Sequence, residues 1–193
     1  MRFRTTIVGM FMAVAATIAC GLAQAVSAFE ASQTVAGTPL VLNGAGTRYR
    51  AVFKVYDMAL YVKSKASNVN AIMDMPGPKR INFVALRDLP GTDLGTAFLR
   101  GIESNSPKSQ TQKHVASTLR LIDIFSGKSR LMPGDAFAME FIPGKGTTFF
   151  IDGKAQGAPV GDAEFFGMVL RIWLGESPVD WKLKDALLGL EGK

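Results

Sequence analysis

The segment from Arg48 to Val62 constrains the fold of this chain more than any other feature. It is rich in valine, phenylalanine and tyrosine and contains no proline, which is the composition of an extended strand. Strand periodicity puts Arg48 and Tyr56 on the same face. We therefore predict one long strand over residues 48–62, preceded by a short strand over 40–42 that ends in the turn signal Asn43-Gly44.

The first 28 residues have the pattern of a secretory signal peptide. Arg2 and Arg4 precede an uncharged run that closes on Val26-Ser27-Ala28, and this small-x-small ending favours cleavage before Phe29. No positively charged stop-transfer flank follows, so we predict removal of the segment rather than a membrane anchor. The expected product is a periplasmic protein, a single domain of residues 29–193 with no integral membrane segment.

Composition bounds the chemistry of what remains. The 165 residues after position 28 are enough for one domain with a real core. Because the removed segment carries two arginines and no acidic residue, the formal charge falls from +6 to +4. No basic cluster of the kind that binds nucleic acid is present. The only cysteine, Cys20, lies in the removed segment, so the exported protein has no disulfide and is held by hydrophobic packing.

His114 is the sole histidine, and the exported chain has no thiol. Zinc sites built on histidine and cysteine, cysteine–histidine nucleophiles and iron–sulfur clusters are therefore excluded. We predict no metal and no cofactor. His114 could act as a base with Ser117 or Asp123, but the amphipathic pattern around it favours a polar residue on a half-exposed helix face.

The rest of the chain alternates between strand and helix patterns. Strands are predicted over 81–86, 136–142 and 147–151, with Asp152-Gly153 as a hairpin turn after the last. Helices are predicted over 67–73, from Thr92 or Asp93 through Ile102, from Pro107 to Gly127, from Asp162 to Gly175 and from Asp180 to Leu190. This order predicts an α+β protein with helices layered on one face of a largely antiparallel sheet.

Several stretches carry a resemblance to a known family. Leu42-Asn-Gly-Ala-Gly-Thr-Arg48, followed by Phe53-Lys-Val-Tyr-Asp-Met-Ala-Leu-Tyr61, resembles the start of the chalcone isomerase fold. Ile151-Asp-Gly153, Phe165-Phe166 and Ile172-Trp-Leu-Gly175-Glu-Ser-Pro178 resemble the closing hairpin and helices of exported bacterial chalcone isomerase-like proteins. The resemblance implies an open-faced β-sandwich, in which a layer of helices covers a long antiparallel sheet and a ligand cleft lies between them.

The resemblance implies two kinds of function, because this fold serves enzymes that close a chalcone to a flavanone and non-catalytic relatives that bind fatty acids. Arg48 falls on the arginine that stabilises the phenolate in the enzymes, and it is the one catalytic residue assigned if this protein is an enzyme. Tyr56 falls where the enzymes have a threonine, while Thr111 and Thr118 fall where they have a tyrosine and an asparagine. Because the catalytic set is mostly missing, we expect binding rather than catalysis.

Arg48 with Tyr56 is similar to the pair with which the fatty-acid-binding members hold a carboxylate. A guanidinium offers two coplanar donors, a tyrosine hydroxyl adds a third, and an apolar cavity takes the alkyl tail. We therefore predict a small amphipathic carboxylate as the partner, with Arg48, Tyr56, Thr111 and Thr118 as ligand-binding residues. Arg48 is expected at the closed end of a large apolar cleft, with no other ionisable group nearby.

Two other functions stay open. An isomerase, or intramolecular lyase, acting on a phenolic enone needs a polar group beside Arg48, from Thr111, Thr118 or Tyr61. An envelope scaffold protein with a vestigial cleft needs none.

The distance between Arg48 and Tyr56 is the main geometric question. In a straight strand the two Cα atoms would be roughly 26 Å apart, so the two residues share a ligand only if the chain bends. Arg50 and Lys54 are alternative cations on the same face. In a purely structural role, Arg48 would instead pair with an acid such as Glu140 in the core.

Overall fold

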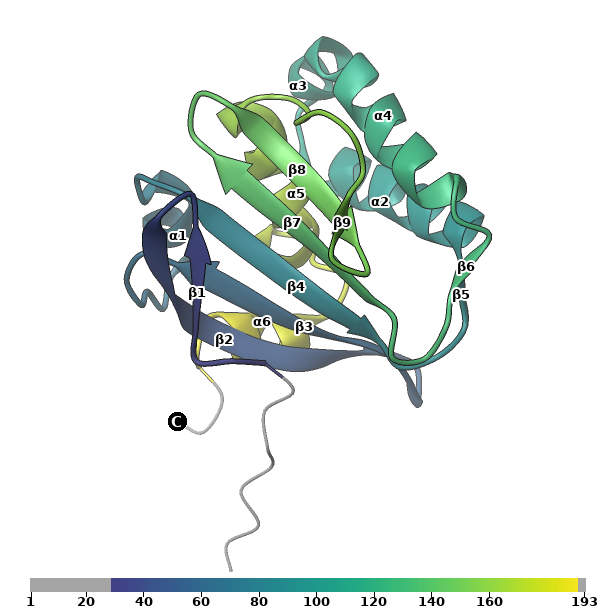
Figure 1. Ribbon diagram of the computed structural model, residues 1–193, viewed down its shortest axis with the longest axis horizontal. Helices are drawn as coiled ribbons and strands as arrows, with labels where there is room; N and C mark the ends of the chain where they lie inside the picture. The colour runs from purple at the N-terminus through teal and green to yellow at the C-terminus, as the bar shows by residue number, and fades with distance from the viewer. Residues whose placement is uncertain (1–28, 191–193) are drawn as a thin grey trace, which may run out of the picture.

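Seven strands form one antiparallel sheet in the computed structural model, which describes residues 29–190. In spatial order they are β1 (Ser32–Val35), β2 (Thr38–Arg50), β3 (Phe53–Val62), β4 (Lys79–Ala85), β7 (Ala136–Ile142), β8 (Gly146–Ile151) and β9 (Lys154–Ala155). A separate two-stranded sheet pairs β5 (Leu89–Pro90) with β6 (Arg130–Leu131). Figure 1 shows the large sheet curled, with helices packed against it.

Six helices accompany the sheet in this part of the chain. They are α1 (Val69–Asp74), α2 (Gly91–Asn105), α3 (Lys108–Lys113), α4 (Val115–Ser126), α5 (Ala163–Leu174) and α6 (Trp181–Leu187). Helix α2 packs against α4 and α5, and α6 packs against β2. The predicted α+β class, with helices layered on an antiparallel sheet, is confirmed. Over residues 29–190, no helix combines the length and apolar character needed to cross a membrane, and the predicted signal peptide, 1–28, lies outside the described residues.

The single long strand predicted over residues 48–62 is wrong, because the chain reverses at Ala51 and Val52. Strand β2 ends before this turn, β3 begins after it, and the two strands pair antiparallel. Ala51 has a φ of 54°, a left-handed conformation that non-glycine residues seldom adopt and that tight hairpin turns use. The reversal places Arg48 directly opposite Tyr56 in the strand ladder, which removes the geometric objection to a shared site.

The predicted turn at Asn43-Gly44 is also wrong, because β2 runs through it. The register with β3 shifts between Leu42 and Gly44, as it does at a β-bulge. The buried Asn43 side chain donates to the Leu187 carbonyl at 2.7 Å and accepts from the Ala66 N–H at 2.8 Å. Tertiary hydrogen bonds therefore hold a turn-favouring residue inside a strand.

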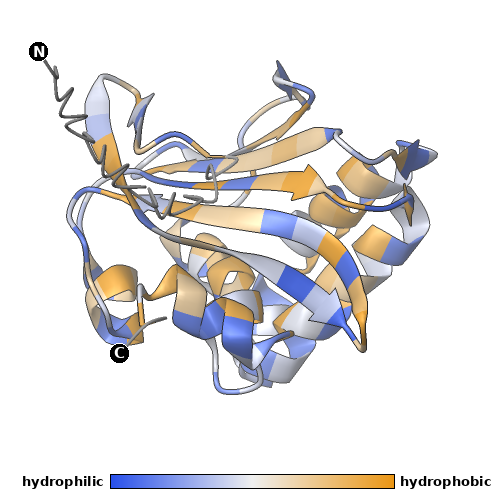
Figure 2. Cartoon of the chain, turned by 90° about the horizontal axis from the view of Figure 1, so that it is seen from below, coloured by the Kyte–Doolittle hydropathy of each residue, from blue (hydrophilic) through white to orange (hydrophobic). Residues whose placement is uncertain are grey.

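Both faces of β3 are largely buried after Lys54, so apolar residues lie on both faces of the strand. On the face toward the helices, Met58 and Leu60 belong to the main core with Phe83 and Phe137. On the opposite face, Tyr61 belongs to a smaller cluster with Val35, Leu40 and Ala59. Bands of apolar and polar residues follow one another along the strands in Figure 2.

The helix predicted from Pro107 to Gly127 is interrupted at His114, whose φ of −104° and ψ of 22° end α3 and begin α4. The expected half-exposed position of His114 is wrong, since its side chain is 6% exposed and its Nε2 lies 2.9 Å from Glu164 Oε2. The predicted caps at Asp162 and Asp180 are confirmed. Each carboxylate accepts hydrogen bonds from backbone N–H groups in the first turn of its helix.

Candidate anion-binding site

Alternate residues of β2 face the helix layer. Where these residues are small, α6 packs on the strand, and a cavity opens beyond the end of this contact. At Gly44, an added Cβ would lie 2.0 Å from the carbonyl oxygen of Ala186, so α6 packs directly on the strand backbone. Farther along β2, the Tyr49 N–H donates to Asp180 Oδ2 at 2.9 Å. Arg48 therefore lies beside the start of α6, at the end of the surface that this helix covers.

A buried tyrosine supports the guanidinium of Arg48. The Arg48 Cζ atom lies 5.5 Å from the centroid of the Tyr56 ring, within the range of a cation–π contact. The Tyr56 hydroxyl accepts a 2.7 Å hydrogen bond from Nε1 of Trp173, whose ring packs against Phe83 and Phe98. Burial raises the pKa of Tyr56, and the charge of Arg48 only partly opposes this, so the phenol stays protonated at neutral pH. Tyr56 is thus a neutral, well-packed platform for Arg48.

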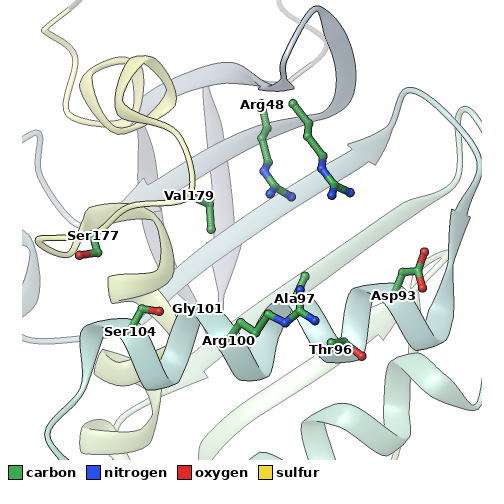
Figure 3. Close-up of a pocket in the computed structure, with 10 residues that line it drawn as sticks. Arg48, Asp93, Thr96, Ala97, Arg100, Gly101, Ser104, Ser177 and Val179 are labelled. Atoms are coloured by element: carbon green, nitrogen blue, oxygen red, sulfur yellow. The ribbon is translucent and has the colours of Figure 1, made fainter.

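A cavity of about 470 Å³ opens beside Arg48, between β2, α2 and the segment that joins α5 to α6 (Figure 3). Strand β2 contributes Arg48 and Arg50, and the joining segment contributes Ser177 and Val179. Helix α2 contributes the remaining wall, which consists of Asp93, Thr96, Ala97, Arg100, Gly101 and Ser104. These helical residues recur every three or four positions and so form one face of α2.

The walls of the cavity are tied together. The Asn105 side chain donates to the Ser177 carbonyl and accepts from the Ser177 N–H, both at 2.9 Å, so the joining segment is anchored to the end of α2. Gly101 lets α2 approach α5 closely, because a Cβ there would lie 2.8 Å from Ile172 Cγ2. These contacts fix the position of the α2 wall.

The charge of the cavity is strongly positive, since its lining holds three arginines and one aspartate. Within residues 29–190, none of these three guanidinium groups pairs with a carboxylate. The Arg48 Nε is buried and has no hydrogen-bond partner in the same part of the chain. A buried donor without an acceptor, in a cationic cavity of ligand size, is suited to binding an anion.

The cavity differs from the large apolar cleft that we expected. Three other ionisable side chains share its lining with Arg48, so the prediction of no other ionisable group nearby is wrong. Next to Tyr56, aromatic side chains fill the space between sheet and helices, with Phe83 stacked on Phe137 at 4.0 Å between centroids. The protein's own core therefore occupies the volume in which a deep apolar cleft was expected.

The structure brings Arg48 and Tyr56 together, but it does not bring Thr111 and Thr118 to them. The two threonines line a separate pocket of about 220 Å³ between α2 and the α3–α4 region. Thr111 Oγ1 donates to the Lys108 carbonyl at 2.9 Å. Tyr61 faces the opposite side of the sheet, where its hydroxyl donates to the Glu30 carbonyl. None of the three groups proposed to assist an isomerase lines the cavity beside Arg48.

The structure also places the residues considered as a partner of Arg48 or as a replacement for it. Glu140 forms an ion pair with Arg80 across β4 and β7, so it is not the partner of Arg48. Arg50 lines the same cavity as Arg48, whereas Lys54 is exposed and outside its lining. The site therefore contains one of the two alternative cations in addition to Arg48.

Sequence reasoning missed the α2 wall. Asp93, Ala97, Arg100 and Ser104 recur at helical spacing, and this periodicity is the signal that could have placed them on one face. That signal is weak, because a helix face with two charged residues is ordinarily a solvated one.

A second group of ionisable side chains lies outside the cavity lining. His114, Asp162 and Glu164 offer three possible metal-ligand atoms within 4.8 Å of one another. Glu164 is already paired with Lys113, and Asp162 Oδ1 accepts from the Phe165 N–H at 3.0 Å. Hydrogen bonds from Lys113 and then His114 lower the pKa of Glu164 to about 2. These side chains therefore contact one another and the backbone, and they join the α3–α4 junction to the start of α5.

The fold and the site together define an α+β protein with a ligand-sized, arginine-lined cavity between an antiparallel sheet and its helix layer. The chain belongs to the chalcone isomerase-like family, because the sequence profile of that family matches residues 23–189. The family resemblance drawn from the sequence is thereby confirmed.

Among solved structures, the chain is similar to a fatty-acid binding protein of Arabidopsis thaliana. The TM-score is 0.61 and the sequence identity 16%, over 84% of this chain and 92% of that chain. At this identity the likeness shows a shared fold, which confirms the predicted chalcone isomerase-like architecture. None of the curated proteins compared matches the chain.

Proposed function

We propose that this protein binds an amphipathic carboxylate, with the carboxylate on Arg48 and the aliphatic part in the cavity beside it. The observation that carries the proposal is the state of Arg48, which is supported by Tyr56, lacks a carboxylate partner within the described residues and has a buried Nε without an acceptor. A carboxylate supplies the planar pair of acceptors that matches a guanidinium. The similar Arabidopsis structure is described as a fatty-acid binding protein, which supports the same class of ligand.

The size of the cavity favours an acid of medium length. Its volume of about 470 Å³ falls at the lower end of the usual range for small-molecule sites, about 300–1,000 Å³. Ala97, Gly101 and Val179 offer apolar contacts in its lining, and each buried methylene contributes about 0.8 kcal/mol. We therefore choose decanoate as the first ligand to test.

Binding without catalysis is the function that we favour. An isomerase acting on a phenolic enone is expected to use Thr111, Thr118 or Tyr61 beside Arg48, and none of these side chains lines that cavity. A scaffold role with a vestigial cleft does not account for an unpaired arginine beside a cavity. Because of the signal-peptide pattern in residues 1–28, we further propose that the protein acts in the periplasm.

Calorimetric titration of the exported protein with decanoate, after removal of bound lipid, tests this proposal. Arg48→Gln is expected to weaken binding by about 10- to 150-fold, because a charge-assisted hydrogen bond contributes about 1.5–3 kcal/mol. The matched control is Arg120→Gln, which removes the same charge from an exposed position outside the cavity. Equal affinities in the wild type and both variants would contradict the proposal, as would a wild type that does not bind.

A further inference from the structure

The cavity presents guanidinium groups from two of its walls. Arg48 and Arg50 come from β2, and Arg100 comes from α2. Figure 3 shows Arg48 extending from the sheet toward the helix, while Arg100 lies along α2 across the cavity from it. Asp93 is the single carboxylate in the lining, which leaves a formal charge of +2.

One carboxylate on the ligand does not pair with all the arginines that line the cavity. A carboxylate has two oxygens, and a single guanidinium can occupy both in a bidentate pair. If Arg48 takes that role, Arg50 and Arg100 stay without an anionic partner in the cavity. No acid among residues 29–190 pairs with Arg50 or Arg100, so both remain available to a second negative charge on the ligand.

We propose that the head group of the ligand carries two negative charges, with Arg48 holding one and Arg100 holding the other. Two carboxylates on neighbouring carbons, or on one carbon, have this chemistry, and so does a phosphate monoester, whose charge at pH 7 is about −1.5 to −2. This inference rests on the proposed function, because it names the head group for the same cavity.

The lining of the cavity fits such a head group in two further ways. Ser104 and Ser177 also line the cavity, so neutral hydroxyl donors are available to the head group. Asp93 lies about two helical turns before Arg100 on the same face of α2. Its negative charge disfavours an anion beside it, so we expect the doubly charged group to lie away from Asp93.

Three probes with the same eight-carbon tail test the inference. Decanoate carries one negative charge, octylmalonate carries a second carboxylate on the same carbon, and octyl phosphate replaces both carboxylates with a phosphate monoester. Calorimetric titrations are run at pH 8 with the wild type, Arg100→Gln and the control Arg120→Gln. Arg100 is exposed, and the melting temperature of each variant checks that the fold is kept.

We expect one or both doubly charged probes to bind the wild type about tenfold more tightly than decanoate, the low end for one added charge-assisted contact. Arg100→Gln should remove this preference, because it should weaken binding of the doubly charged probes more than binding of decanoate, while Arg120→Gln should keep it. A preference for octylmalonate identifies a dicarboxylate, and a preference for octyl phosphate identifies a phosphate monoester.

Three outcomes overturn the inference, and they can be told apart. If decanoate binds as tightly as both doubly charged probes, the head group has one charge and the proposed function stands. If Arg100→Gln leaves the preference intact, Arg100 does not hold the second charge, and the inference fails while the proposed function stands. If none of the three probes binds, the proposed function fails together with this inference.

Discussion

Replacement of Trp173 by alanine is expected to lower the free energy of unfolding by about 3–5 kcal/mol, the range for deleting a buried aromatic side chain. Trp173 is 2% exposed and its ring lies against Phe83 and Phe98. The substitution leaves a cavity among these rings, and it also removes the indole N–H that donates to the Tyr56 hydroxyl. Because Tyr56 supports Arg48, we expect the variant to bind carboxylates more weakly as well.

The second tryptophan of the chain is a matched control for this prediction. Trp181 is 61% exposed and its ring lies 4.9 Å from the ammonium group of Lys184. Trp181→Ala should change the free energy of unfolding by no more than about 0.5 kcal/mol, as surface substitutions usually do. Urea unfolding followed by circular dichroism at 222 nm measures both variants without relying on tryptophan fluorescence. Similar losses in the two variants would show that Trp173 does not have the core position described above.

Gly44→Ala is expected to destabilise the protein by about 3 kcal/mol or more, at or above the upper end of the usual cost of overpacking. A Cβ at position 44 would lie 2.0 Å from the Ala186 carbonyl oxygen and 2.8 Å from backbone atoms of Leu187. Backbone atoms cannot rotate away as a flexible side chain does, so α6 must move off β2. That movement also breaks the hydrogen bond from Asn43 to the Leu187 carbonyl.

A glycine in α5 provides the comparison for Gly44. Gly167 has no atom within 4 Å of a Cβ built at its position, and it lies inside a helix. Gly167→Ala should therefore raise stability, by up to about 1 kcal/mol, because alanine favours the helix more than glycine does. Thermal and urea unfolding of the two variants should give changes of opposite sign. A stable Gly44→Ala protein would mean that α6 does not pack on the strand backbone.

The sequence predicted the starts of two helices correctly from a capping carboxylate followed by a hydrophobic period, whereas α2 starts at Gly91, before the predicted caps Thr92 and Asp93. The caps at Asp162 and Asp180 predicted the starts of α5 and α6 correctly, since a carboxylate before an apolar helical pattern satisfies the first backbone N–H groups. The turn at Asp152-Gly153 was predicted for a similar reason, because both residues tolerate the positive φ values of 49° and 75° that they adopt.

The β2–β3 turn could not be predicted from local chemistry. Ala51 and Val52 are poor turn residues, and the positive φ of Ala51 is imposed by the pairing of the strands on either side. At Asn43-Gly44 a turn was predicted where the structure has a strand. Tertiary hydrogen bonds and the close packing of α6 keep these turn-favouring residues extended. In both cases long-range packing overrode local preference.

Only part of the candidate site could be predicted, because long-range packing brings the rest of it together. Arg48 and Tyr56 were found because the family resemblance marks them, and the hairpin then places them opposite each other. Arg100 was not found, since only the packing of α2 beside β2 brings it to the same cavity. The filled aromatic core around Phe83 was also out of reach, because apolar composition does not reveal whether rings close a cavity or line it.

Native mass spectrometry of the protein recovered gently from the periplasm, run beside Arg48→Gln, tests most directly whether Arg48 holds an anionic ligand. The account predicts the protein mass of a chain that begins at Phe29. It also predicts a bound species whose mass matches an amphipathic acid. That species should be absent or strongly reduced in Arg48→Gln and retained in Arg120→Gln. An empty wild-type protein, or a bound species that is equally abundant in all three proteins, would contradict the account.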